Sequence, residues 1–136
     1  MITQKMVNEI SYNIVNCAIE VNKELGPGLL EKIYEICLID EMKNRGLDVK
    51  SQVLLPVRFK NNTLDAGLKI DILVNDLVIV ELKAVDAIIP IYKAQLLTYL
   101  KLSCKPKGLL INFNTTNITQ QLVPLVTEIF SNLPKE

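Results

Sequence analysis

KIDILVNDLVIVELK, residues Lys69–Lys83, contains two of the most apolar runs of this chain. Two apolar runs flank Asn75-Asp76, which is a turn signal, so this stretch predicts an antiparallel hairpin of strands at about 64–74 and 77–84. Apolar residues occupy both faces of each run, as is typical of a central strand pair covered on both sides. The hairpin therefore predicts the middle of a sheet that is flanked by helices.

Three charged residues interrupt this apolar hairpin: Asp71, Glu81 and Lys83. Charged groups are seldom buried unless they are paired or bind a metal. The spacing of two places Glu81 and Lys83 on one face of a strand. Two interpretations remain open at this point: a divalent-cation site for phosphodiester cleavage, and a structural ion pair between Glu81 and Lys83.

The cation interpretation depends on the length of the hairpin loop. A loop of only Asn75-Asp76 would set Asp71 opposite Val80, with its side chain pointing away from Glu81. A loop of odd length, such as Asn75-Asp76-Leu77, or a bulge would bring Asp71 and Glu81 to the same face.

The rest of the chain predicts an α/β domain with a mixed sheet. Apolar spacing predicts a helix over 4–25, a break at Gly26-Pro27-Gly28 and a second helix over about 29–44 that ends before Gly46. Residues 53–59 read as an edge strand, or as a strand with a bulge at Pro56, because Pro56 lacks an N–H. A helix over 91–102 and a buried strand over 107–113 follow, while residues 118–133 are ambiguous between a strand and a helix interrupted at Pro124. The expected inward residues are Leu30, Ile33, Tyr34, Cys37 and Leu38 on the second helix, and Ala94, Leu97 and either Thr98 or Lys101 on the third.

Composition narrows the classes of function. The 136 residues are expected to form a single domain over 1–136, with 49% hydrophobic and 22% charged residues. Histidine is absent, which excludes histidine-dependent triads and histidine zinc sites. The three cysteines have no zinc spacing, and Cys17 and Cys37 read as core thiols. No apolar run is long enough for a bilayer and no targeting signal is recognisable, so we expect no membrane partner and a cytoplasmic location.

Fifteen basic and fifteen acidic residues give a net charge of zero. Binding to long duplex DNA usually requires a basic surface, so the balance argues modestly against a protein that clamps DNA alone. A small nuclease that contacts DNA only locally remains compatible with this balance of charge.

Hard oxygen ligands in the hairpin suit Mg²⁺ or Mn²⁺. We expect Asp71, Glu81 and the backbone carbonyl of Leu82 to bind the ion, and Lys83 to orient or deprotonate a water or to offset charge on the phosphate. Glu31 borders the apolar stripe of the second helix; it is either a first-turn acid or a further ligand. Gln95 and Tyr99 share a helical face four residues apart and could contact substrate, although such a pair is often structural.

These motifs together resemble the GxxExxY family of the PD-(D/E)XK nuclease superfamily. The resemblance rests on Gly28-Leu-Leu-Glu31-Lys-Ile-Tyr34, Asp71…Glu81-Leu-Lys83, Gln95-Leu-Leu-Thr-Tyr99-Leu and Gly108-Leu-Leu-Ile-Asn112-Phe113, which occur in matching order over nearly all of residues 8–113. It implies a restriction-endonuclease-like αβββαβ core, a mixed sheet flanked by helices, and a Mg²⁺-dependent nuclease site. Glu31, Asp71, Glu81 and Lys83 would be its catalytic residues, with Gln95 and Tyr99 on the substrate side. Two departures are Ile70 in place of proline before Asp71, and Tyr92 or a neighbour where many relatives have histidine.

The leading hypothesis is therefore a metal-dependent nuclease acting on DNA, in preference to RNA. The alternative is an inactive nuclease-fold module that binds nucleic acid or a protein. A homodimer is compatible with either, since two sites are the simplest way to cut both strands of a duplex.

Overall fold

Two helices open the chain, separated by the predicted glycine–proline break. In the computed structural model, which describes residues 1–136, α1 spans Gln4–Leu25 and α2 spans Glu31–Asn44. Thr3 caps α1, because its hydroxyl accepts the Met6 N–H at 3.1 Å. Gly26 ends the helix with φ +65°, a conformation that glycine adopts without strain. Both predicted helices are therefore confirmed.

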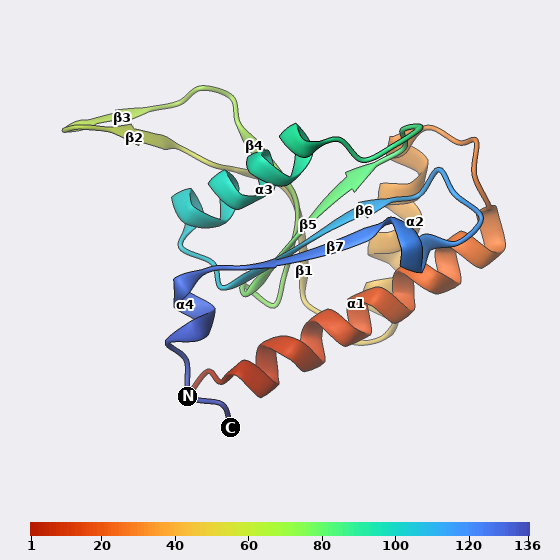
Figure 1. Cartoon of the computed structure of the whole chain (residues 1–136), viewed down its shortest axis with the longest axis horizontal. Coiled ribbons are helices and arrows are strands. Elements are labelled where there is room, and N and C mark those ends of the chain that lie inside the picture. The colour runs from red at the N-terminus through yellow and green to blue at the C-terminus, as the bar shows by residue number, and fades with distance from the viewer.

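The central element is a five-stranded mixed sheet (Figure 1). Its strands lie in the order β1-β4-β5-β6-β7, and only β5 and β6 are parallel. A parallel pair needs a crossover, and α3 provides it. The order α2-β1-β4-β5-α3-β6 is the predicted αβββαβ core. The strands and the third helix are β1 (Val49–Leu54), β4 (Lys69–Val74), β5 (Val78–Lys83), α3 (Pro90–Ser103), β6 (Lys107–Asn112) and β7 (Leu122–Val126).

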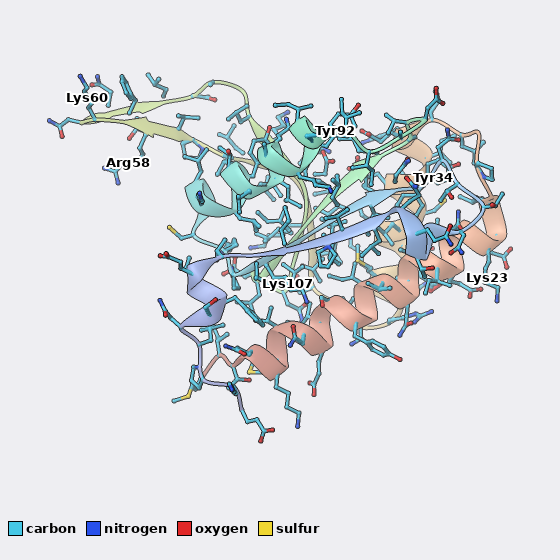
Figure 2. All side chains as sticks on the ribbon, viewed as in Figure 1. Lys23, Tyr34, Arg58, Lys60, Tyr92 and Lys107 are labelled. Carbon is cyan, nitrogen blue, oxygen red and sulfur yellow. The ribbon has the colours of Figure 1, made fainter.

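A hairpin arm projects from the body between β1 and β4. We call residues 57–64 the arm; it comprises β2 (Val57–Phe59) and β3 (Asn62–Leu64), which pair only with each other. Figure 2 shows Arg58 and Lys60 on this arm, far from the helices that flank the sheet. The predicted continuous strands over 53–59 and 64–74 were wrong. Pro56 breaks the first, and a turn at Gly67, with φ +72°, breaks the second.

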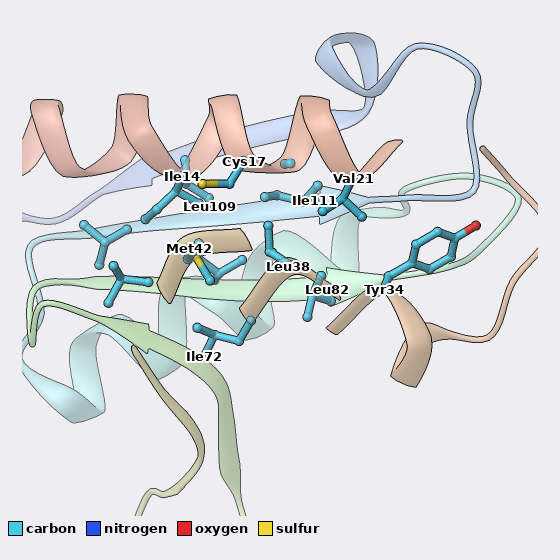
Figure 3. Close-up of a cluster of buried hydrophobic side chains, with 14 of the residues drawn as sticks. Ile14, Cys17, Val21, Tyr34, Leu38, Met42, Ile72, Leu82, Leu109 and Ile111 are labelled. Atoms are coloured by element: carbon cyan, nitrogen blue, oxygen red, sulfur yellow. The ribbon is translucent and has the colours of Figure 1, made fainter. Parts of the chain in front are cut away.

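Two hydrophobic clusters cover the faces of the sheet. The larger cluster lies beneath α1 and α2 and includes Ile14, Cys17 and Leu38 (Figure 3). The smaller cluster packs α3 on the opposite face. A Cβ atom at Gly108 would lie only 2.9 Å from Leu96 Cδ1, so glycine lets α3 approach β6 closely.

The buried faces of α2 and α3 differ in part from the predictions. Tyr34 and Leu38 are fully buried, as expected, and Cys37 is half-buried. Leu30 and Ile33 are 74% and 40% exposed, so their predicted burial was wrong. On α3 the inward residues are Leu96, Tyr99 and Leu100, not the predicted set. This helix carries apolar residues around much of its surface, so periodicity did not identify the buried side.

The end of the chain returns to the start of α1. β7 resolves the ambiguous tail as an edge strand, where Pro124 is tolerated, and η1 (Ile118–Gln121) and α4 (Glu128–Ser131) flank it. The N–H groups of Gln4 and Lys5 donate to the carbonyls of Pro134 and Lys135 at 2.8 and 3.1 Å. The two termini therefore lie together (Figure 1). No helix combines the length and the apolar character that crossing a membrane requires.

Candidate active site

The loop between β4 and β5 contains three residues, Asn75, Asp76 and Leu77. Asn75 and Asp76 have φ values of 51° and 57°, in a region that these two residue types tolerate better than most. The Asn75 side chain accepts the Asp48 N–H at 2.8 Å, and Asn75 N–H donates to the Asp48 carbonyl at 2.8 Å. Lys105 Nζ lies 2.9 Å from Asp76 Oδ1. These contacts stabilise a loop with an odd number of residues, as the interpretation of a cation site requires.

This loop brings Asp71 and Glu81 together. The last residues paired in the β4–β5 ladder are Ile72 and Val80. At the next position, hydrogen bonds from backbone N–H groups to side-chain carboxylates take the place of the backbone pairing. Asp71 N–H donates to Glu81 Oε1 at 3.3 Å, and Leu82 N–H donates to Asp71 Oδ2 at 3.1 Å. Each carboxylate therefore satisfies a backbone N–H of the opposite strand while lying next to the other carboxylate.

Glu81 is the buried member of this pair, with only 6% of its surface exposed. Burial and the negative charge of Asp71 raise the pKa of the Glu81 carboxyl to about 8, and the charge of Lys83 opposes this only in part. No ion pair involves Asp71 or Glu81. The two carboxyl groups thus lie side by side with no cation in direct contact, and a proton on Glu81 relieves the repulsion between them below about pH 8.

Lys83 contacts an aromatic ring instead of an acid. Its Nζ lies 4.5 Å from the ring centroid of Tyr92 on α3, a cation–π geometry. Lys83 has no carboxylate within 4.0 Å, so the alternative of a structural Glu81–Lys83 ion pair was wrong. The half-buried Lys83 side chain remains free to interact with an anion.

Glu31 lies at the first position of α2 and is exposed. Desolvation raises the pKa of its carboxyl, and the charge of Asp71 adds to the increase, while the charge of Lys83 opposes it. Its electrostatic coupling to both residues indicates that the start of α2 faces the acid pair. No hydrogen bond joins Glu31 to either residue.

A second acid on α2, Glu35, was missed by the sequence analysis. Glu35 is 5% exposed, and both its carboxylate oxygens accept hydrogen bonds from Gln52 Nε2, at 3.3 and 3.0 Å. Gln52 lies in β1 with φ +52°, a left-handed conformation that is rare inside a strand. The spacing of four residues from Glu31 could have drawn attention to Glu35. No feature of the sequence predicted the left-handed backbone conformation at Gln52.

Gln95 and Tyr99 interact with each other. Gln95 Nε2 donates to the Tyr99 hydroxyl at 3.1 Å, and Tyr99 is largely buried while Gln95 is exposed. Neither residue bonds to the acid pair or to Lys83. Tyr92 lies one helical turn before Gln95 on α3, so the same side of this helix reaches Lys83.

The turn before α2 is held by the buried Tyr34 side chain and by the half-buried amide of Asn114. The Tyr34 hydroxyl donates to the Gly26 carbonyl at 2.6 Å and accepts the Leu29 N–H at 3.1 Å, and its ring stacks on Phe113 with centroids 5.0 Å apart. The side chain of Asn114 accepts the Gly28 N–H at 3.0 Å. These contacts position the start of α2, and with it Glu31.

Two carboxylates and a nearby backbone carbonyl form a donor set suited to a hard divalent cation. No cluster of three or more acidic, cysteine or histidine side chains is placed to hold a metal ion. The four surface pockets also lie elsewhere. The largest, about 640 Å³, is formed by the N-terminal part of α1 and the C-terminus. The buried Glu81 and the half-buried Asp71 mark the site better than pocket size does, because a cation recognises charge and ligand chemistry.

Comparison with known families and proteins agrees with this architecture. A family model described as the PD-(D/E)XK nuclease superfamily matches residues 8–124, which include both carboxylates of the hairpin, Lys83 and the start of α2. No curated protein and no solved structure gives a match.

Proposed function

The chain belongs to the PD-(D/E)XK nuclease superfamily, and we propose that it hydrolyses phosphodiester bonds of DNA with Mg²⁺ or Mn²⁺ as cofactor. The observation that carries this proposal is the meeting of Asp71 and Glu81 at the end of the β4–β5 ladder. A buried carboxylate beside a second carboxylate, without a cationic partner, is an environment that a divalent cation stabilises. RNA is the second candidate substrate.

The residues that would hold the cation are Asp71, Glu81, the backbone carbonyl of Leu82, and Glu31. Leu82 N–H faces β4, and the N–H and carbonyl of one strand residue point to the same side, so the carbonyl also points to the β4 side of the strand. Glu31 contributes charge from α2 and could complete the set as a third acid. When bound, the cation supplies Lewis-acid polarisation of a phosphoryl oxygen and lowers the pKa of water.

Lys83 acts on the reacting groups from the same strand as Glu81. Its ammonium group is free of carboxylate partners and can donate hydrogen bonds to phosphate oxygens as negative charge develops on them. It can also orient the attacking water or move its proton. The ring of Tyr92 limits the positions that this ammonium group adopts.

Gln95 and Tyr99 are proposed to contact the substrate. The hydrogen bond from Gln95 to the Tyr99 hydroxyl orients both groups, and the remaining amide donors and acceptor of the exposed Gln95 can contact phosphate or a base edge. We also propose that the chain is a member of the GxxExxY family, on the basis of Gly28, Glu31 and Tyr34. A homodimer would supply two sites for the two strands of a duplex.

Cleavage by the purified protein tests the proposal. Linear duplex, nicked duplex, single-stranded DNA and RNA would each be incubated with Mg²⁺, Mn²⁺ or EDTA. We expect cleavage that requires a divalent cation and falls by about a hundredfold or more in Glu81→Ala and Lys83→Ala.

Matched controls separate site effects from general loss of charge. Glu9→Gln and Lys5→Ala replace an exposed acid and an exposed lysine in the first turns of α1 and should cleave like the wild type. Absence of cleavage by the wild type, or full cleavage by the Glu81 and Lys83 variants, would contradict the proposal.

One observation favours a second candidate function, that of a nuclease-fold module without catalysis. No third acidic side chain joins Asp71 and Glu81 in a metal-holding cluster. Isothermal titration of Mn²⁺ and Mg²⁺ into wild type and Glu81→Gln distinguishes the two functions. Binding that is lost in Glu81→Gln supports the nuclease, and no Glu81-dependent binding supports the module.

A further inference from the structure

The arm carries apolar side chains that nothing in the molecule covers. Phe59 is 61% exposed and Leu64 is 48% exposed. The arm forms hydrogen bonds only within its own ladder, because no bond joins residues 57–64 to the body. An isolated two-stranded hairpin has marginal stability in water. Its exposed ring and its projection from the body are therefore better explained by contact with a partner than by folding requirements.

The arm is positively charged within a chain whose net charge is zero. Residues 57–64 include Arg58 and Lys60 but no acid. Neither cation forms an ion pair. Lys60 Nζ lies 5.5 Å from the Phe59 ring centroid, so one of the two cations flanks the exposed aromatic ring. An unpaired lysine beside an aromatic ring, with a second unpaired cation on the same hairpin, matches the phosphates and bases of nucleic acid.

The ladder separates the arm into two faces. Val57 pairs with Leu64, and Phe59 pairs with Asn62, so these four residues share one face. Arg58 pairs with Thr63 on the other face. A flat aromatic surface and hydrogen-bonding donors are therefore presented by the same short hairpin.

The base of the arm is connected directly to the candidate site. Leu55 N–H donates to the Leu68 carbonyl at 2.8 Å, which closes the base, and β4 then leads through Ile70 to Asp71. Leu55 and Ile70 also belong to the cluster that packs beneath α3. A strand of nucleic acid held by the arm would thus lie on the β4 side of the acid pair.

We propose that the arm binds unpaired nucleotides of the nucleic-acid substrate, with Phe59 stacking on a base and Arg58 and Lys60 binding phosphates. This assignment deepens the proposed nuclease function, on which it rests for the identity of the substrate. A second copy of the chain is a poorer occupant. Two arms that met through their Phe59 faces would bring two unpaired Lys60 side chains together, with no acid in either arm to offset them.

Binding to oligonucleotides in EDTA tests the arm without relying on cleavage. The probes are fluorescein-labelled oligo(dT) and a blunt duplex, measured by fluorescence anisotropy over a series of KCl concentrations. We expect tighter binding of the single strand and a loss of about 5- to 100-fold in Phe59→Ala. Phe59→Trp should retain the affinity, because it preserves a stacking ring. Tyr12→Ala, which removes a 68% exposed ring from α1, is the matched control and should bind like the wild type.

The salt dependence tests the two cations. Loss of two phosphate contacts in the double variant Arg58→Ala/Lys60→Ala should reduce the slope of log K against log [KCl] by about 1.4 for a single strand. Lys5→Ala/Lys23→Ala is the control pair on α1. Circular dichroism would verify that each variant is folded.

Several results would overturn the arm's assignment. Equal affinity of wild type and Phe59→Ala, or no binding by the wild type, would do so. So would a dimer, detected by sedimentation, that Phe59→Ala dissociates without loss of oligonucleotide binding. Binding that depends on Phe59 in a protein that cuts nothing would support the arm and contradict the nuclease. Cleavage that does not depend on Phe59 would support the nuclease and contradict the arm's assignment.

Discussion

Asp71 and Glu81 lie at the same level of β4 and β5, where Asp71 N–H donates to Glu81 Oε1 at 3.3 Å and Asp71 Oδ2 accepts the Leu82 N–H at 3.1 Å. The two acids thus have two roles, one that stabilises the fold and one that creates electrostatic repulsion. They accept backbone N–H groups where the ladder ends, and their closeness opposes the ionisation of both carboxyl groups at once. Five predictions follow from this arrangement and from its surroundings.

The stability of the metal-free protein should fall as the pH rises. The pKa of Glu81 is raised from 4.5 to about 8 in the folded protein, first by burial and then by Asp71. A carboxyl whose pKa is higher in the folded state contributes stability that is fully present below about pH 4.5 and is lost as the pH rises through about 8. We expect the Tm in EDTA to fall by at least about 3 °C between pH 6 and pH 9. Glu81→Gln should flatten this profile, and Glu9→Gln should not; a profile that Glu81→Gln leaves unchanged would refute the assignment.

Replacement of Asp71 should separate its charge from its hydrogen bond. Asp71→Asn removes the negative charge beside Glu81 but keeps an oxygen that accepts the Leu82 N–H. We expect it to be neutral or stabilising at pH 8 in the apo protein. Asp71→Ala leaves that N–H unpaired and should be less stable than Asp71→Asn by about 1–3 kcal/mol. Urea unfolding measures both, and equal stabilities of the two variants would rule out this division of roles.

Lys83 should matter for activity far more than for stability. It makes no ion pair, so Lys83→Met is expected to change the free energy of unfolding by less than about 1 kcal/mol. A buried Glu81–Lys83 ion pair would instead cost about 3–5 kcal/mol when broken. Chemical denaturation distinguishes these values. A loss in the higher range would restore the ion-pair interpretation.

The ring of Tyr92 should tune the position of Lys83. Tyr92→Phe keeps the aromatic face and should cleave substrate at nearly the wild-type rate. Tyr92→Leu removes a cation–π contact worth about 0.5–2 kcal/mol, so we expect its rate to fall by about 2- to 30-fold with little change in KM. Single-turnover cleavage with saturating protein measures the chemical step. Equal rates for the Phe and Leu variants would exclude this role.

The hydrogen bonds between Gln52 and Glu35 should stabilise the packing of β1 against α2. Gln52→Ala removes the donor of a buried carboxylate and also places alanine at φ +52°, so it should destabilise the fold by about 2–3 kcal/mol. Gln52→Gly removes the donor but tolerates the backbone conformation. Thermal unfolding should therefore rank the wild type first, Gln52→Gly second and Gln52→Ala last. A glycine variant as stable as the wild type would mean that backbone strain, not the hydrogen bonds, dominates.

Local sequence patterns were sufficient for most of the core elements. The spacing of apolar residues identified α1, α2, the β4–β5 hairpin, α3 and β6, because each has a strong period or a continuous apolar run. The arm was not foreseen. Its two strands were merged with β1 and β4, because apolar residues continue through Leu54, Leu55 and Val57 and only Pro56 marks the break. Strands of three residues leave too little pattern to be separated from their neighbours.

Site residues were recognised where charge interrupted an apolar strand. Asp71, Glu81 and Lys83 stood out on that ground, and their roles as ligands and catalyst stay predictions. Glu35 did not stand out, because an acid on a helix is ordinary unless its burial is known. Tyr92 was noted only because it lies where many relatives have histidine. Its contact with Lys83 joins a helix to a strand, and no sequence pattern relates the two residues.

A hairpin with two acids and a lysine inside an apolar sheet can be predicted from the amino-acid sequence, because alternation and hydrophobicity are local properties. The meeting of the two acids is a property of the folded chain. That outcome depends on left-handed backbone at Asn75 and Asp76, which is stabilised by Asp48 and Lys105 from distant parts of the chain. If the same residues formed a loop one residue shorter, Asp71 would point to the opposite face from Glu81, because successive side chains of a strand alternate between its two faces.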